Sequence, residues 1–353
     1  MRSPPPSASS AAGAARLDAL IERHLFARYS AAVVRVERGG RVVYERAAGT
    51  VRDDGGPAVY VDTRFDLASI TKVFLATVAL LLVARGALEL DAPLTGLVPE
   101  WRDGDHATVT LRALLAHVAG FRSGADYRTL FAERIEAFAL REPLVAVPGE
   151  RVVYSDLGFL ALGVVLARSA GLALEPLIER ELRTLGCACV TFALRERGEA
   201  FPATERDAWR GLVQGSVHDE KAALAGGAAG HAGLFADARD VARLAECYLA
   251  PYHGRPSPLP AELVFAATRE QAFDPVPRRG LGWALKTSDE NSCGAALSAQ
   301  TFGHTGFTGT CVWADPQRDL SIVVLTNAVH YGRSDLRDVR AALCDAAVAA
   351  YGT

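Results

Sequence analysis

Two β-hairpin patterns lie near opposite ends of this 353-residue chain, and a long region of helical patterns separates them. Residues 31–49 alternate around the Arg-Gly-Gly-Arg sequence at 38–41, which predicts a hairpin. Residues 310–314 and 320–327 are β-rich runs joined by an Asp-Pro-Gln-Arg-Asp turn sequence, which predicts a second one. We therefore expect an α/β (α+β) fold, with one antiparallel sheet built from both chain ends and a helical lobe inserted between them.

Helical spacing predicts the remaining elements. Gly86 is expected to end one helix as a C-terminal cap, and Asp237, with Asp240 three residues on, resembles a capping box. We expect a disordered leader over 1–15, a sheet lobe over 16–69 plus 280–353 and a mainly helical lobe over 70–279, with the active site between the lobes. The expected helices cover 16–29, 70–85, 111–116, 157–168, 237–248 and 334–351.

Composition narrows the classes of partner. Hydrophobic residues make up 50% of the chain, charged residues 22%, and the net charge is -3, as in an ordinary soluble globular protein. No run of basic residues interleaved with aromatics suggests nucleic acid or an anionic membrane. The longest apolar stretch, residues 73–84, is too short for a bilayer that needs about 20 residues. We expect no membrane or nucleic-acid partner; the oligomeric state stays open.

The compartment follows from two further features. Six scattered cysteines, without a C-x-x-C spacing, predict free or buried thiols in a chain long enough to need no disulfide framework. Residues 1–15 lack the apolar segment of a secretory signal. We expect a cytoplasmic protein; a differently assigned start codon with a signal peptide would instead place it in the periplasm.

The segment Phe-Asp-Leu-Ala-Ser-Ile-Thr-Lys at 65–72 places Ser69 and Lys72 three positions apart at the start of a helix. Residues at this spacing share a helix face, so the amine can reach the hydroxyl. A serine attacks a carbonyl only if a neighbour accepts its proton, and a buried lysine can do this once burial and nearby cations depress its pKa. The S-x-x-K spacing alone is weak, because about one such pair occurs by chance in a chain of this size.

Two further motifs follow in the chain: Tyr154-Ser155-Asp156 opens another expected helix, and His304-Thr305-Gly306 leads into a strand. With these three motifs the chain resembles the class C β-lactamase family of serine hydrolases, which includes penicillin-binding proteins, D-amino-acid peptidases and β-lactamase-fold esterases. The motifs correspond to S-x-x-K, Y-x-N and K-T-G. The resemblance extends from about Arg16 onward, and implies a β-lactamase/transpeptidase-like fold.

The resemblance implies an acyl-enzyme mechanism on an ester, amide or β-lactam carbonyl of a small-molecule or peptide-like substrate, without cofactor or metal. Ser69 would be the nucleophile, and Lys72 and Tyr154 would relay its proton. The backbone N–H groups of Ser69 and Phe307 would form the oxyanion hole, and Asp156, His304, Thr305 and Gly306 would line the substrate site.

Two positions depart from the family pattern. Asp156 replaces an amide that could donate to a substrate carbonyl, although it can hold Lys72 charged or orient it. His304 replaces a lysine, and binds a substrate carboxylate more weakly than a fixed cation does. The first change argues against a preference for amide side chains in the substrate, and the second favours esters or unusual amides over penicillins. They also leave open an alternative function, an acyl-binding sensor that is acylated at Ser69 but hardly turns over.

Other histidine and carboxylate clusters in the sequence fit ordinary structural roles. His218, Asp219 and Glu220 with His231 downstream fit no helix-borne metal motif, and we expect a cleft-lining loop instead. His117 is expected to be a hydrogen-bonded core residue. The G-x-S-x-G nucleophile elbow and both standard phosphate-loop spacings are absent from the sequence, which excludes the main rival serine-hydrolase fold and nucleotide chemistry.

Overall fold

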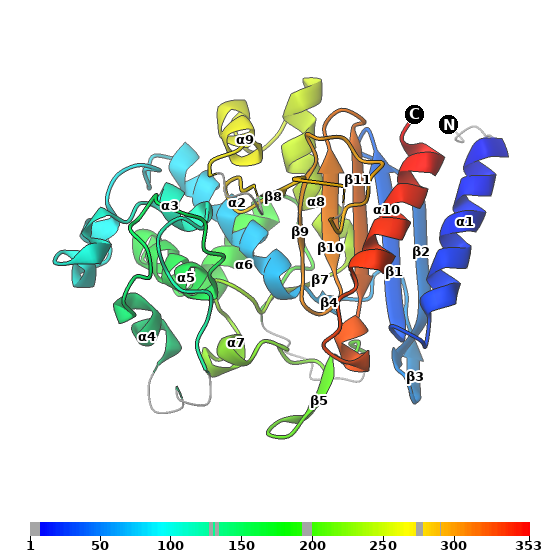
Figure 1. Cartoon of the computed structure of the whole chain (residues 1–353), viewed down its shortest axis with the longest axis horizontal. Helices are drawn as coiled ribbons and strands as arrows, with labels where there is room; N and C mark the ends of the chain where they lie inside the picture. The colour runs from blue at the N-terminus through cyan, green and yellow to red at the C-terminus, as the bar shows by residue number, and fades with distance from the viewer. Residues whose placement is uncertain (1–7, 127–129, 131–133, 193–199, 273–277, 290) are drawn as a thin grey trace.

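A seven-stranded antiparallel sheet joins the two ends of the chain (Figure 1). The computed structural model describes residues 8–126, 130, 134–192, 200–272, 278–289 and 291–353. The strand order is β3-β2-β1-β11-β10-β9-β8, so the N-terminal hairpin pairs with the C-terminal one through β1 and β11. The strands are β1 Ala31–Arg38, β2 Arg41–Arg52, β3 Gly55–Ala58, β8 Ala284–Leu285, β9 Phe302–Thr305, β10 Cys311–Asp315 and β11 Leu320–Thr326.

Both faces of the central strands are buried, and their residues alternate between two hydrophobic clusters, as the two-residue period of a strand requires. Val33 of β1 and Val323 of β11 face the larger cluster, whereas Val34 and Val324 face the smaller one. The smaller cluster is closed by α1 (Ala8–His24) and α10 (Arg337–Tyr351), which pack side by side on the outer face of the sheet (Figure 1). Both hairpins predicted from the sequence are confirmed.

The helix α1 begins at Ala8, inside the segment 1–15 that was expected to be a disordered leader. That expectation is wrong for residues 8–15, and residues 1–7 lie outside the described part of the chain. The alanine-rich segment has a high helix propensity, and Gly13 allows close packing, since a Cβ there would lie 2.2 Å from Ala350 Cβ of α10.

The inner face of the sheet is covered by α8 (Ala238–Leu249), which contacts β1, β10 and β11. Asp237 caps this helix by accepting a hydrogen bond from the Asp240 N–H at 2.9 Å. The other helices lie to the side of the sheet (Figure 1). They are α2 Thr71–Ala84, α3 Leu111–Leu115, α4 Ile135–Arg141, α5 Asp156–Ala170, α6 Leu174–Thr184, α7 Glu220–Leu224 and α9 Ala261–Thr268.

Short elements connect these layers. The small sheets pair β4 (Phe65–Asp66) with β7 (Phe235–Ala236) and β5 (Glu205–Asp207) with β6 (Gly211–Val213). The 3₁₀ turns are η1 Ala68–Ile70, η2 Leu94–Gly96, η3 Pro99–Trp101, η4 Asp105–Thr108, η6 Ala250–His253 and η7 Ala328–Tyr331.

The helix α2 is buried almost all round, from Thr71 to Leu82, which fixes the segment that starts at Ser69. No single described helix is long and apolar enough to span a membrane; only the pair α5 and α6, bent by 79°, reaches the necessary length and composition together. All six cysteines are unpaired, and five of them are buried.

Candidate active site

Ser69 lies in the turn η1, which continues directly into α2. The preceding residue, Ala68, has φ = 45°, in the left-handed region that non-glycine residues rarely occupy. Asp66 holds this turn: its buried carboxylate accepts the Ala68 N–H at 2.8 Å and the His218 N–H at 2.7 Å. Strained backbone persists where the surroundings over-determine it, and here it presents Ser69 in a fixed direction.

Lys72 lies one helical turn beyond Ser69 and is fully buried. Its ammonium group has three N–H donors, and three acceptor atoms lie within hydrogen-bond distance of it. They are Ser69 Oγ at 2.9 Å, Asp156 Oδ1 at 2.8 Å and the His231 carbonyl oxygen at 3.1 Å. The contact between Lys72 and Ser69 expected from the three-residue spacing is therefore present.

The charge state of Lys72 differs from the expectation. Burial alone would lower the pKa of Lys72, but the Asp156 carboxylate and the Tyr154 hydroxyl together raise it above its usual value. The expected depression of this pKa is therefore wrong for the resting protein, because Asp156 places a carboxylate where the Y-x-N pattern has an amide. Burial opposes ionisation of Asp156 too, but Lys72, with His231 and Lys221, holds the Asp156 pKa below its usual range.

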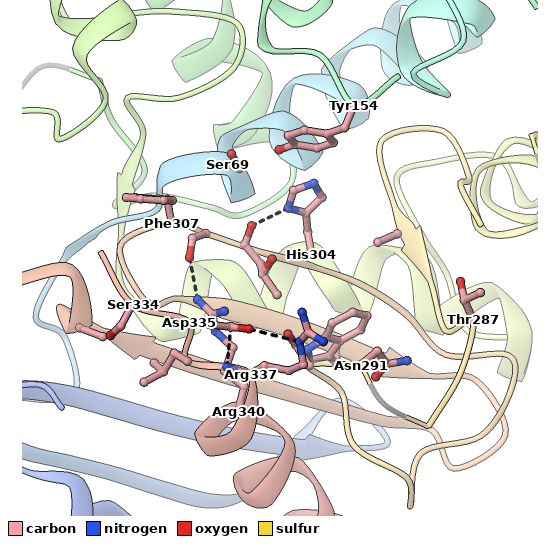
Figure 2. A pocket seen from close by; sticks show the side chains of 18 of the residues that line it. Ser69, Tyr154, Thr287, Asn291, His304, Phe307, Ser334, Asp335, Arg337 and Arg340 are labelled. Carbon is pink, nitrogen blue, oxygen red and sulfur yellow. Dashed lines mark hydrogen bonds and ion pairs between the residues drawn. The ribbon is translucent and has the colours of Figure 1, made fainter. Parts of the chain in front are cut away.

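Tyr154 precedes α5, whose N-cap Ser155 accepts the Gly158 N–H at 2.9 Å. The Tyr154 ring centroid lies 4.9 Å from Lys72 Nζ and 4.5 Å from the His117 ring centroid. His117 is a core residue, as expected, and its Nδ1 accepts the Ser155 N–H at 3.1 Å. Figure 2 shows Tyr154, Ser69 and His304 facing the same pocket.

His304 is neutral and its tautomer is defined. Burial, with Arg279 and Lys72 nearby, lowers the pKa of His304 to about 3. Because its Nδ1 lies 2.8 Å from the Thr305 carbonyl oxygen, which can only accept, the proton is on Nδ1 and Nε2 is left as an acceptor (Figure 2). Nε2 is buried without a partner among the described residues. The site therefore has no cation at the position of the K-T-G lysine.

The loop from Thr305 to Thr310 is tied to the backbone that precedes Ser69. Thr308 Oγ1 donates to the Asp66 carbonyl oxygen at 2.8 Å, and Thr310 Oγ1 donates to the Leu67 carbonyl oxygen at 3.3 Å. Arg340 of α10 donates to the Gly306 carbonyl oxygen at 2.7 Å from the other side (Figure 2). These bonds fix the backbone of Phe307 relative to that of Ser69.

Both backbone N–H groups proposed for the oxyanion hole are available. Neither Ser69 N–H nor Phe307 N–H has a hydrogen-bond partner within the part of the chain that the structure describes. Free backbone donors of this kind stabilise the oxyanion of a tetrahedral intermediate. The Phe307 side chain is 55% exposed, so it can contact a substrate above this point.

A cavity of about 830 Å³ opens beside Ser69 and extends toward the start of α10. It is lined by four arginines, Arg279, Arg333, Arg337 and Arg340, and by one carboxylate, Asp335. Arg333 contacts Glu205 at 2.8 Å and Glu220 at 2.6 Å, and Arg337 contacts Asp335 at 3.4 Å. Arg279, whose Cζ lies 5.0 Å from the Tyr154 ring centroid, has its Nε buried without a hydrogen-bond partner among the described residues.

The segment from His218 to His231, expected to be a cleft-lining loop, contains the helix α7, and none of its residues is among those that line the cavity. His231 Nε2 is 2.7 Å from Asp219 Oδ1, and His218 stacks on Phe307 with ring centroids 5.6 Å apart. Ligand atoms of Asp156, Asp219 and His231 lie within 4.8 Å of one another, as a metal site would need. Because the ammonium groups of Lys72 and Lys221 already contact these carboxylates, the arrangement fits ion pairing better.

Two residues at the site were missed by sequence analysis. Lys221 follows the His-Asp-Glu sequence, and Arg279 precedes the Gly-Leu-Gly-Trp sequence at 280–283. Neither belongs to a motif with a chemical meaning of its own. The scarcity of lysine was the one signal that could have pointed to Lys221, since the chain has only three lysines.

The fold and the Ser69–Lys72 pair define the class of serine hydrolases that act through an acyl-enzyme, and comparison with known proteins agrees. A family model described as Beta-lactamase matches residues 17–347. The chain therefore belongs to the beta-lactamase family.

Individual relatives include an esterase and a carboxypeptidase. The chain is 32% identical over 376 residues to Esterase EstB of Burkholderia gladioli, covering 93% of this chain and 94% of that protein. It is 29% identical over 361 residues to a Salmonella agona (strain SL483) protein named as an inferred D-alanyl-D-alanine carboxypeptidase, covering 89% of this chain and 82% of that one.

A solved structure shares the whole fold. EstCE1, described as a hydrolase with promiscuous acyltransferase activity, matches with a TM-score of 0.78 at 21% identity, over 96% of this chain and 100% of that one. The chain is thus a serine hydrolase with a β-lactamase-like fold, and nothing in the comparisons supports the alternative of an acyl-binding sensor.

Proposed function

We propose that the protein is a carboxylic-ester hydrolase in which Ser69 forms the acyl-enzyme. The observation that supports an ester over a β-lactam is the neutral His304 in the place of a lysine. Without a fixed cation there, the carboxylate of a penicillin or of a D-alanine terminus loses the partner that the K-T-G lysine would provide. Esterase EstB, over nearly its whole length, is similar to this chain and agrees with this assignment.

Asp156 supports the same substrate class. In the Y-x-N pattern an amide can donate to a substrate amide carbonyl, but the Asp156 carboxylate accepts only and is already paired with Lys72 at 2.8 Å. An ester needs less help at this point, because its alkoxide is a better leaving group than an amide nitrogen. The proposed substrate is therefore a small ester that fills part of the 830 Å³ cavity.

The proposed acylation moves one proton along a defined route. Once Lys72 has lost a proton, Ser69 Oγ attacks the ester carbonyl while its own proton passes to the Lys72–Tyr154 pair, and the oxyanion is held by the N–H groups of Ser69 and Phe307. The proton then passes to the alkoxide as the C–O bond breaks, which releases the alcohol. Water attacks the acyl-enzyme by the reverse route, which releases the acid and restores the Ser69 hydroxyl.

The test combines intact-protein mass spectrometry with turnover. We expect a fluorophosphonate to add one label at Ser69, p-nitrophenyl acetate and butyrate to turn over many times, and nitrocefin to turn over at least tenfold more slowly. Ser69→Ala should abolish both labelling and ester turnover, with Ser292→Ala, at another cavity serine, as the matched control. Rapid nitrocefin hydrolysis would contradict the ester assignment, and ester turnover by Ser69→Ala would contradict the nucleophile.

A further inference from the structure

Five residues form a closed ring of contacts behind Ser69. Lys72 contacts Asp156 at 2.8 Å, Asp156 contacts Lys221 at 3.3 Å, and Lys221 contacts Asp219 at 3.3 Å. Asp219 contacts His231 Nε2 at 2.7 Å, and the His231 carbonyl oxygen accepts from Lys72 at 3.1 Å. The members come from α2, α5, the start of α7 and the following loop, so four separate segments meet here.

The two lysines of the ring share one carboxylate. Asp156 Oδ1 faces Lys72 and Asp156 Oδ2 faces Lys221. The Lys221 side chain is 14% exposed, so its charge acts on its neighbours with little screening by solvent. Charges therefore alternate along Lys72, Asp156, Lys221 and Asp219, and the negative charge of Asp156 that stabilises protonated Lys72 is partly compensated by Lys221.

The composition of the chain suggests that position 221 requires a lysine rather than an arginine. The chain has 35 arginines and only three lysines, Lys72, Lys221 and Lys286. Surface cations are thus almost all arginine, whereas the Lys221 ammonium is enclosed between two carboxylates. A compact ammonium group at this point can bridge two separate carboxylates without filling the space beside Lys72.

Lys221 keeps its charge over the range in which Lys72 must work. Burial alone would lower the pKa of Lys221, but Asp219 and Asp156 raise it above its usual value. Burial opposes ionisation of Asp219, but His231, with Lys221, holds the Asp219 pKa well below its usual range. The charged or titratable groups that face Lys221 are Asp156 from α5, Asp219 at its own helix start and, through these, His231 and Lys72.

We propose that Lys221 is a positioning residue for catalysis, which offsets the charge of Asp156 and so lowers the pH at which Lys72 can give up a proton and accept that of Ser69. Lys221 contacts neither Ser69 nor the cavity lining; it acts through Asp156. This inference rests on the proposed roles of Ser69 and Lys72.

The test is the pH dependence of two independent rates, fluorophosphonate labelling of Ser69 and kcat/KM for p-nitrophenyl acetate. Lys221→Met removes the cation and should move the acid limb of both profiles to higher pH by about one unit. At a pH on the acid side of the limb, each rate should then be about tenfold lower than in the wild type. Removing the opposing anion in Asp219→Asn should move the limb the other way, because Asn keeps the helix cap and leaves Lys221 wholly to Asp156. Lys221→Arg should keep the limb near its original pH.

Opposite shifts from two neighbouring substitutions distinguish an electrostatic role from a structural one. Profiles that fall in parallel at all pH values, with unchanged limbs, would overturn the proposal. If Lys221→Met fails to fold, Asp219→Asn and Lys221→Arg still decide the question by the direction of their shifts. Failure of the wild-type protein to label at Ser69 at any pH would instead contradict the proposed function, so the two failures are distinguishable.

Discussion

Lys72 Nζ lies 2.8 Å from Asp156 Oδ1, so the group expected to deprotonate the nucleophile is itself held protonated by a carboxylate. The same ammonium donates to Ser69 Oγ at 2.9 Å. In the resting state Ser69 is therefore a neutral hydroxyl and Lys72 is protonated, and activation of Ser69 requires that Lys72 lose a proton.

Asp156→Asn tests this relationship. Loss of the carboxylate removes the main charge that raises the pKa of Lys72, so deprotonation becomes easier. We expect the acid limb of kcat/KM for p-nitrophenyl acetate to move to lower pH by about one unit or more. Asp156→Glu, which keeps the charge, is the matched control; an unmoved limb in Asp156→Asn would mean that Lys72 is not the titrating group.

Gly306→Ala tests the oxyanion loop. A Cβ at this position would lie 2.1 Å from Thr310 Oγ1 and 2.5 Å from the Leu67 carbonyl oxygen, so the loop must move away from Ser69. Loss of one oxyanion donor lowers kcat by roughly 10²- to 10³-fold, and we expect a fall of that order with little change in KM. Gly96→Ala, where a Cβ meets nothing within 4 Å, should leave turnover unchanged.

His304→Lys tests the substrate class by restoring K-T-G. A fixed cation here provides a charge-assisted contact to a substrate carboxylate, worth about 1.5 kcal/mol or more. We expect acylation by a fluorescent penicillin to become about tenfold faster, measured as the rate of covalent labelling, while neutral esters gain nothing. His304→Gln, which adds no charge, controls for the loss of the imidazole; an equal gain in both variants would contradict the assigned role of charge.

The buried histidines predict how stability depends on pH. Burial is the largest cause that lowers the pKa of both His117 and His304, the latter to about 3. The unfolded chain therefore binds more protons below its own histidine pKa of about 6.5, and the free energy of unfolding falls as pH drops. Each histidine contributes a loss of roughly 1.4 kcal/mol per pH unit between about 6.5 and its folded pKa.

Denaturant unfolding between pH 7 and pH 5 measures this slope. His304→Gln should reduce this slope by roughly the contribution of one histidine. An identical slope in His304→Gln and the wild type would show that His304 is not held neutral in the folded protein.

Elements with a strong local pattern were predictable from the sequence. The hairpin over 31–49 and the helix after Ser69 have unambiguous periods, and both appear in the structure. The helix over residues 8–15 was missed, because its alanines have no amphipathic pattern of their own and its position depends on packing against α10. The Beta-lactamase family match agrees with the resemblance that the three motifs carry.

Within the site, the Ser69–Lys72 contact was predictable and the motif comparison raised the pairing of Asp156 with Lys72, but the ring through Lys221 was not predicted. The Ser69–Lys72 contact follows from helix geometry alone. The raised pKa of Lys72 depends on Asp156, and the ring through Lys221 depends on Asp219 and His231, which are distant along the chain. Such pairing is defined by tertiary structure, so no local pattern contains it.

The hydrogen bond from Arg340 to the Gly306 carbonyl oxygen connects the last helix of the chain to the oxyanion loop. The helix α10 forms the outer layer of the sheet, whereas α2 lies in the larger core, so partial opening of the outer layer leaves the nucleophile in place. Undocking of α10 on heating would therefore inactivate the enzyme through loss of the Arg340–Gly306 hydrogen bond, with Ser69 still in place. The temperature at which activity is lost is then set by the packing of α10 against α1 and β11. Stabilising that packing should lengthen the half-life of activity at high temperature without any change near Ser69.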